Sequence, residues 1–380
     1  MPRRKYSLAT IAVAIASLSV PTSVIAQSAA ASTEVAAATV AYASGTTLAA
    51  YLGAQTDASL SAPTSAARIA RGMHNYNASS VALYVSNSNG NTITEYDIET
   101  GALIRTVVKA GPELKGAKGI AFDSEGNLYV AGRYSNSVVK YNRQTGQVLS
   151  VLDPKHKGQI SGPQGLNFGP DGKLYVASSD NDRIVKLDPA TGNYEGTLTT
   201  VAVPGAEHTL PIDPYFGPDG SLYIGTFSGH KLLKYQGPEA SGTEAAVAEK
   251  KPKPGTLLAT FEDSRPGVSN MSVAKGHPTF YFSDVIDPVT FSGSVAQYTL
   301  DGKFVRTLVP TGTGGMRLPG GIAAGPDGNL YVASVKLDQN FKDSGSTILK
   351  FNPSTGELLG ELVGTGHGLD VPFAMAVGPR

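Results

Sequence analysis

The chain has 380 residues, with 31 basic and 31 acidic side chains, 44 glycines and no cysteine. A nucleic-acid partner or an anionic membrane surface would require a basic excess, so the balanced charge argues against both. The absence of cysteine excludes disulfides, thiolate metal sites and a cysteine nucleophile.

The first 26 residues are typical of a secretory signal peptide. Arg3, Arg4 and Lys5 precede an apolar stretch over 8–20, and the small residues that end at Ala26 resemble a cleavage site. A membrane anchor is the alternative, but the stretch is shorter than the roughly 20 residues that a span needs. We therefore predict export to the periplasm or the medium, with no membrane span after cleavage. Residues 27–72 are rich in Ala, Ser and Thr without periodicity, which predicts a linker.

A repeat occupies residues 73–380. Its marker is a Leu-Tyr-Val-like strand whose tyrosines lie 45, 46, 48, 58 and 50 residues apart. This period is typical of β-propeller blades rather than of helical or leucine-rich repeats. The six tyrosines are Tyr84, Tyr129, Tyr175, Tyr223, Tyr281 and Tyr331.

Two turns frame the strands of each repeat. A Gly-Pro-Asp-Gly-like turn, as at 169–172, precedes the tyrosine strand, and a Thr-Gly turn, as at 191–192, follows the next strand. Pro, Asp and Gly suit successive positions of a type I turn, so the pattern predicts four short antiparallel strands per blade. The longest tyrosine interval holds a polar, proline-rich segment, residues 237–255, which predicts a protruding insertion.

The two ends of the repeat region complement each other. The first repeat lacks an opening strand before Leu83, whereas residues 372–379 follow the last repeat and echo residues 319–326. We predict that this late strand completes the first blade and closes the ring, which hides strand edges that would otherwise aggregate. The expected fold is therefore an all-β, six-bladed propeller, and we expect a monomer.

The turn and strand Gly-Pro-Asp-Gly and Leu-Tyr-Val-Ala, followed by Ile-x-Lys-x-Asp-x-x-Thr-Gly, resemble the NHL-repeat and gluconolactonase-like six-bladed propellers. The streptogramin B lyases belong to the same broad assembly. The resemblance covers about residues 73 to 380 and implies ligand binding on the face that carries the loops between second and third strands. These motifs build turns and packing rather than chemistry, so the resemblance specifies fold more than function.

The lyase resemblance implies a Glu at the end of a second strand, with His nearby. No His lies in a predicted first strand, and only one of the matching positions is acidic. The sequence therefore disfavours lyase acid–base chemistry. The six matching positions are Asn87, Gly132, Ser178, Thr226, Asp284 and Ser334.

The gluconolactonase resemblance implies a hard divalent cation, Ca²⁺ or Mg²⁺, held by oxygen ligands at the mouth of the channel. Such an ion could polarise a lactone carbonyl and activate water. Asp213, Asn270 and Asp284 come from neighbouring predicted blades and are the candidate metal ligands, and Lys118 and Gln164 could add polar contacts. Alternatively, Asp213 and Asn270 accept hydrogen bonds from backbone N–H groups in turns.

Two functions remain open from the sequence. The first is an exported propeller that binds a small molecule, glycan or protein on its loop-bearing face, with the predicted loops from Asp284 to Ser294 and from Val335 to Ser346 as its rim. The second is a metal-dependent hydrolase or lyase that acts at the channel mouth. A deep channel lined by the three candidate ligands would favour the enzyme, and side chains that cap turns would favour binding.

Overall fold

The computed structural model describes residues 80–152, 159–217, 219–239, 252–261, 268–272, 279–287 and 292–380, which all belong to the unit Ser65–Arg380. The predicted signal peptide, the predicted linker and residues 240–251 of the predicted insertion lie outside this description and stay predictions. Within the described ranges, no helix is long and apolar enough to span a membrane.

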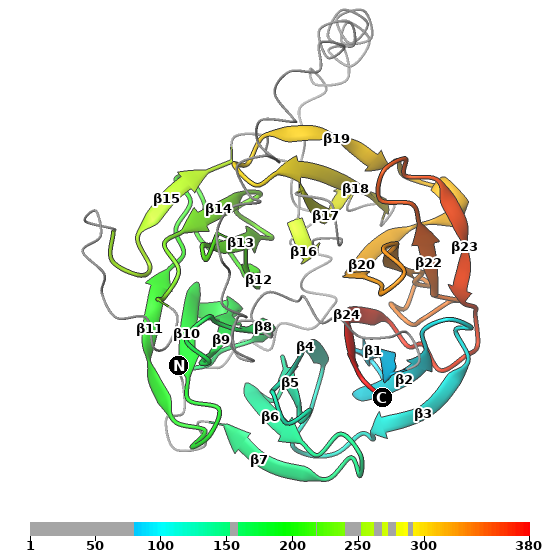
Figure 1. Cartoon of the computed structure of the whole chain (residues 1–380), viewed down its shortest axis with the longest axis horizontal. Helices are drawn as coiled ribbons and strands as arrows, with labels where there is room; N and C mark the ends of the chain where they lie inside the picture. Colours follow the sequence, from blue (N-terminus) through cyan, green and yellow to red (C-terminus); the bar gives the residue numbers. More distant parts are fainter. Residues whose placement is uncertain are drawn as a thin grey trace, which may run out of the picture. The chain divides into compact units, whose positions relative to one another are not determined.

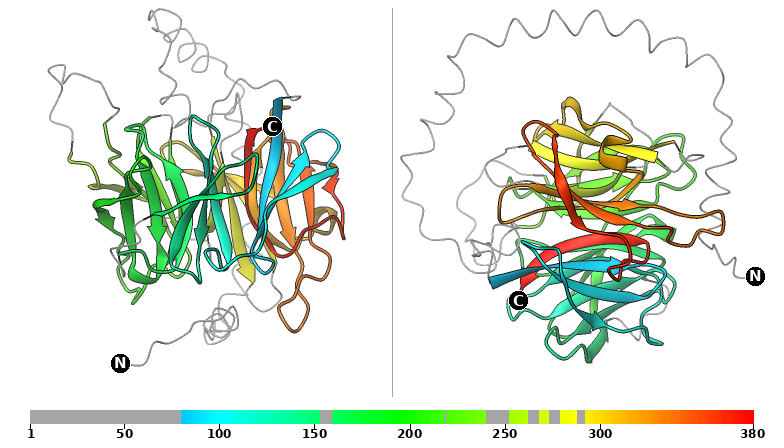
Figure 2. Two further views of the ribbon diagram at one scale, coloured as in Figure 1. Left: turned by 90° about the horizontal axis from the view of Figure 1, so that it is seen from below. Right: turned by 90° about the vertical axis from the view of Figure 1, so that its right-hand side faces the viewer.

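The described residues form six four-stranded antiparallel sheets that are arranged in a ring (Figure 1). This confirms the predicted six-bladed, all-β propeller. Seen from the side, the strands run from one face of the ring to the other (Figure 2). The innermost strands of blades one to six are β24 (Pro372–Pro379), β4 (Ala117–Phe122), β8 (Pro163–Phe168), β12 (Pro211–Phe216), β16 (Val268–Ser272) and β20 (Leu318–Ala324).

The second strand of each blade carries the tyrosine motif. In β1, Tyr84 packs toward the second blade, whereas Leu83 and Val85 pack toward the sixth, because neighbouring strand residues point to opposite faces. The cores therefore lie between blades rather than within them. The second strands are β1 (Val81–Asn87), β5 (Leu128–Gly132), β9 (Leu174–Ser178), β13 (Leu222–Thr226), β17 (Thr279–Asp287) and β21 (Leu330–Val335).

The outer half of each blade is a pair of antiparallel strands, and in every blade but the fourth the Thr-Gly turn or its equivalent joins them. Third strands are β2 (Thr92–Asp97), β6 (Ser137–Tyr141), β10 (Arg183–Leu187), β14 (Leu232–Tyr235), β18 (Ser292–Thr299) and β22 (Thr347–Phe351). Fourth strands are β3 (Leu103–Val108), β7 (Val148–Leu152), β11 (Tyr194–Thr200), β15 (Leu257–Thr260), β19 (Phe304–Val309) and β23 (Leu358–Val363). Two short 3₁₀ turns, η3 (Ser179–Asn181) and η4 (Thr313–Gly315), are also found among the described residues.

The ring closes as predicted. Strand β24 pairs antiparallel with β1, with Tyr84 opposite Ala376, and so supplies the innermost strand of the first blade. The Tyr84 hydroxyl donates a hydrogen bond of 2.6 Å to the carbonyl oxygen of Pro379. The closing strand thus buries an edge of β1 that would otherwise be open to pairing with another chain.

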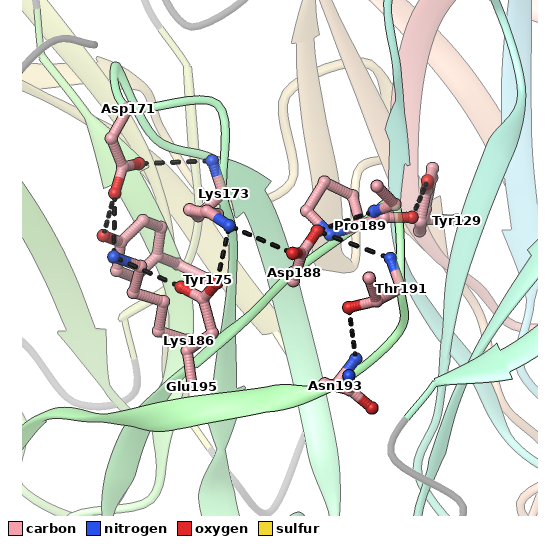
Figure 3. A network of polar contacts seen from close by, with 11 residues as sticks. Tyr129, Asp171, Lys173, Tyr175, Lys186, Asp188, Pro189, Thr191, Asn193 and Glu195 are labelled. Carbon is pink, nitrogen blue, oxygen red and sulfur yellow. Dashed lines mark hydrogen bonds and ion pairs between the residues drawn. The ribbon is translucent and has the colours of Figure 1, made fainter.

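The recurrent tyrosines join neighbouring blades. In the third blade, the Tyr175 hydroxyl donates to Asp171 at 2.9 Å, and Lys186 Nζ lies 3.2 Å from the same carboxylate oxygen (Figure 3). The Tyr129 hydroxyl reaches across to the carbonyl oxygen of Pro189, which lies 3.2 Å away in the next blade. Burial raises the pKa of Tyr175 above its usual range, so the hydroxyl remains a donor. The turn aspartates therefore serve blade packing.

The fifth blade differs from the prediction at one of the expected rim loops. Asp284, expected to end a second strand, lies inside β17, where it pairs with Val268 on one side and Ser294 on the other. The strand continues to Asp287 because the β-branched residues Val285 and Ile286 favour extended, pleated backbone. The hairpin therefore occupies part of the segment that was expected to be a loop.

Candidate functional site

Each innermost strand has a β-bulge near the face that carries the loops between second and third strands. In β4, Ala117 pairs with Gly132 and Ile120 with Val130, so two residues lie opposite the single residue Ala131. The same two-against-one register occurs in the other five blades. A bulge bends the strand and re-aims its side chains. The bulged pairs are 373–374, 118–119, 164–165, 212–213, 269–270 and 320–321 in blades one to six.

In blades two, three and six, the second residue of the bulge is a glycine that lies against the next blade. A Cβ atom on Gly119 would lie 2.7 Å from the carbonyl oxygen of Gln164, and one on Gly165 would lie 2.5 Å from that of Ile212. Only glycine permits such close backbone approach. The first bulge residues of adjacent blades are therefore neighbours around the centre of the ring. We call these first residues the mouth residues: Phe373, Lys118, Gln164, Ile212, Ser269 and Gly320.

Lys118 is a buried cation at this mouth. Its relative exposure is 4%, and Nζ lies 3.6 Å from the ring centroid of the neighbouring mouth residue Phe373. The side chain makes no hydrogen bond or ion pair with any described residue. Burial lowers the pKa of Lys118 well below its usual range, and the nearby positive charge of Arg133 lowers it further. Removal from water favours the uncharged amine.

Gln164 and Arg133 complete this cluster. Arg133 follows strand β5 and donates to the Gly162 carbonyl oxygen at 2.9 Å and to Asp180 at 2.8 Å, so its guanidinium is held in place. Gln164 is 6% exposed, and its Oε1 has no hydrogen-bond partner among the described residues. Since buried polar atoms are normally paired, this acceptor and the Lys118 amine are the unusual features of the mouth.

The predicted site residues fall into two groups. Lys118 and Gln164 are brought together as adjacent mouth residues. Asp213 is half-buried, and its Oδ1 lies 2.6 Å from where a Cβ on Gly165 would be. Asn270 lies in β16 and Asp284 in β17, and Val268 of β16 pairs with Asp284.

The predicted Ca²⁺ or Mg²⁺ site stays a prediction. Asp213 and Asn270 occupy the same bulge position in adjacent blades, which keeps the two residues near one side of the ring. Among the described parts of the chain, no three His, Asp or Glu side chains come close enough together to hold a metal ion.

The sequence interpretation missed Arg133 and did not include Phe373 among the contacts. A signal for Arg133 was available, because the residues at the matching position of the other repeats carry no charge. Those residues are Ser88, Ser179, Phe227, Val285 and Val335. A charged residue at one of six equivalent positions is more readily explained by a local role than by the blade structure.

The segment 180–182, Asp-Asn-Asp, resembles part of a calcium loop but has a structural role. Asp182 adopts a φ of 56°, and its Oδ1 accepts hydrogen bonds from the backbone N–H groups of Thr209 and Leu210 at 2.8 and 2.9 Å. Asn136 does the same one blade earlier, accepting from Gly162 N–H at 2.7 Å. These side chains fasten a loop of one blade to the entry of the next, which is the turn-capping role expected of Asx residues.

A cavity of about 430 Å³ lies on the opposite face, between the turns of the second and third blades. Its lining includes Asp123, Tyr129 and Lys140. These polar groups satisfy one another, because Lys140 Nζ lies 3.0 Å from Asp123 and Tyr129 donates to the same carboxylate. The cavity therefore lacks the unsatisfied groups that distinguish the channel mouth.

Replacement of Lys118 by methionine is expected to raise the free energy of unfolding of the unliganded protein by about 1–2 kcal/mol. A buried amine without a carboxylate partner lowers the stability of the folded state, whereas the methionine thioether retains the packing against Phe373. Urea unfolding at pH 7 measures the difference. Exposed Lys115→Met is the matched control, and we expect it to change stability by less than about 0.5 kcal/mol. A clear loss of stability in Lys118→Met would instead make Lys118 a structural residue.

His208 is expected to make stability depend on pH. Its Nδ1 lies 2.8 Å from Asp182, and this hydrogen bond raises the pKa of His208 above its usual 6.5. The stabilisation is then fully present below pH 6.5 and is lost as pH rises through the raised pKa. His208→Gln should therefore lower the melting temperature slightly at pH 5.5 and not at pH 9. An equal difference in melting temperature between wild type and His208→Gln at pH 5.5 and at pH 9 would contradict this role of His208.

Comparison with known proteins supports the fold. No protein-family model matches the sequence, and no curated protein matches it. A protein of unknown function from Bacteroides caccae is similar in structure, with a TM-score of 0.55 and 14% identity over 79% of this chain and 99% of that one. A chain of a nidogen/laminin complex is similar with a TM-score of 0.54 and 13% sequence identity, over 78% of this chain and 98% of that one. Virginiamycin B lyase from Staphylococcus aureus has a TM-score of 0.49 and 13% sequence identity, over 74% of this chain and 84% of that one.

Identities this low show the fold and assign no activity. The expected resemblance to the broad group of six-bladed propellers is confirmed at that level by the ring of blades together with the two structures of higher TM-score. The chain therefore shares the β-propeller fold of these proteins.

Proposed function

We propose that this propeller binds a small polar molecule at the channel mouth, on the face that carries the loops between second and third strands. One observation carries the proposal: Lys118 and Gln164 are adjacent mouth residues, both buried, with polar groups that no described residue satisfies. An unsatisfied buried polar group costs about 1–3 kcal/mol, so a ligand that pairs with both groups would recover this free energy. The predicted signal peptide would place the binding outside the cytoplasm.

Burial favours a small molecule over a protein partner. Lys118 and Gln164 are 4% and 6% exposed, so little of either side chain is open to a flat protein surface. The ligand needs an acceptor for the Lys118 amine and a donor for Gln164 Oε1. A compact molecule with a carbonyl or carboxylate oxygen and a neighbouring hydroxyl or amino group meets both requirements.

The test is a set of thermal melts of the full chain with single small compounds: amino acids, hydroxycarboxylates, simple sugars and short aldehydes. A compound present at 100 times its dissociation constant should stabilise the protein by about 2.7 kcal/mol. We expect this stabilisation in the wild type and in Lys115→Met, and its loss in Lys118→Met and Gln164→Leu. Stabilisation that persists in both mouth variants would place the ligand elsewhere and overturn the proposal, as would a panel in which no compound has an effect.

A further inference from the structure

We infer that Lys118 is a nucleophilic amine that forms an imine with the carbonyl group of an aldehyde or ketone. This inference rests on the proposed function, because the carbonyl compound would be the ligand of the same mouth. It adds a covalent step to a site that is so far described only by its hydrogen-bonding groups.

The surroundings of Lys118 differ from those of four lysines that lie in the third strands of their blades. Lys140, Lys186, Lys234 and Lys350 each lie within 3.2 Å of a turn aspartate, with which they form structural ion pairs. Lys118 instead lies over the Phe373 ring, without a carboxylate partner among the described residues. A lysine becomes a nucleophile when it is desolvated in an apolar setting or placed next to another cation, and both conditions hold here.

The charged groups around Lys118 support an uncharged amine at neutral pH. Arg133 is the neighbouring cation, and its hydrogen bonds to Asp180 and to the Gly162 carbonyl oxygen keep it in place. Burial and this positive charge lower the pKa of the amine. The Phe373 ring attracts the ammonium form and so opposes these two effects.

The step balances without an oxidant or a reductant. The Lys118 nitrogen attacks the carbonyl carbon, a C–N bond forms, the carbonyl π bond breaks, and a proton moves from nitrogen to oxygen to give a carbinolamine. The new hydroxyl is a donor, and the Gln164 Oε1 atom is an acceptor without a partner among the described residues. Loss of that hydroxyl with the remaining proton of the nitrogen releases water and leaves the imine.

Reductive alkylation of the full chain at pH 7, with formaldehyde and cyanoborohydride, tests the inference, because the reductant traps imines as they form. Peptide mass spectrometry then compares Lys118 with the exposed Lys115 of the same segment. We expect Lys118 to be alkylated at least about tenfold faster, since each unit by which a pKa is lowered raises the uncharged fraction about tenfold. Gln164→Leu should slow alkylation of Lys118 severalfold and leave that of Lys115 unchanged.

Alkylation of Lys118 no faster than that of Lys115 would overturn the imine. The outcome is independent of the melting experiment. If Lys118 is unreactive while Lys118→Met abolishes stabilisation by a small compound, the binding function stands and the covalent step fails. If both experiments fail, the mouth has neither role.

Discussion

Deletion of residues 371–380 is expected to abolish the cooperative unfolding transition of the chain. The deletion removes β24 and exposes β1, whose seven residues are all buried in the intact ring. It also removes Ala374 and Met375 from the cores between the first blade and its two neighbours. The combined loss should exceed the roughly 5–15 kcal/mol by which domains are stable. Circular dichroism during heating, together with gel filtration, would show aggregation in place of a sharp melt.

Removal of Arg380 alone is the control for this deletion. Arg380 lies beyond β24 and contributes an exposed ion pair with Asp97 at 3.2 Å, so we expect a change of less than about 1 kcal/mol. A synthetic peptide of residues 371–380, added to the shortened chain, should restore part of the transition by occupying the open edge of β1. A shortened chain that melts at the wild-type temperature would show that closure by β24 contributes little.

Replacement of Asp182 by alanine is expected to lower the free energy of unfolding by about 2–4 kcal/mol. The carboxylate accepts hydrogen bonds from Thr209 N–H and Oγ1 and from Leu210 N–H, all within 2.9 Å, and Thr209 is 2% exposed. Alanine would remove the acceptor of the Thr209 and Leu210 N–H groups, whereas the Thr209 hydroxyl could still donate to the carbonyl oxygen of Val201. It would also adopt the left-handed φ of 56° less readily than Asp or Asn. Urea unfolding at pH 7 measures the loss.

Asp182→Asn separates the effect of charge from that of geometry. The amide keeps one acceptor oxygen and tolerates the backbone conformation, so we expect a loss of only about 1 kcal/mol. Burial alone would raise the pKa of Asp182, but the hydrogen bonds from His208, Thr209 and Leu210 outweigh it and hold the pKa below 3.8. The free energy of unfolding of the wild type should therefore exceed that of Asp182→Ala above pH 3.8, and the difference should shrink as pH falls through the lowered pKa of Asp182. A difference in stability between the wild type and Asp182→Ala that does not depend on pH would contradict the role of a charged Asp182 carboxylate.

The fold is predictable from the sequence because the residues that build it recur in every repeat. Tyr129, Tyr175 and Tyr223 each bond a turn aspartate of their own blade, and the regular spacing of these tyrosines gives the period of the repeat directly. The closing strand is predictable for the same reason, since residues 372–379 repeat the pattern of another innermost strand.

The site is predictable only in part. Lys118 and Gln164 are expected at the mouth, and they are adjacent there. The bulge that orients them could not be predicted, because a two-against-one register is a property of two paired strands and is not evident in the residues of either strand alone. Arg133 is missed because its role depends on Gly162 and Asp180, which lie in the next blade. Motifs that recur indicate common packing, whereas the mouth residues differ from blade to blade.

The pairing of β1 with β24 also sets the order in which the protein can assemble. Blades two to six are formed by strands that follow one another along the chain, so their hairpins close over far shorter stretches of chain than the first blade does. The first blade joins Tyr84 to Pro379, across 295 residues. A chain emerging from the ribosome can therefore form most of its hairpins early and must wait for residues 372–379 before the ring can close. The appearance of native protein should then follow the rate of one long-range docking event rather than the rate of hairpin formation.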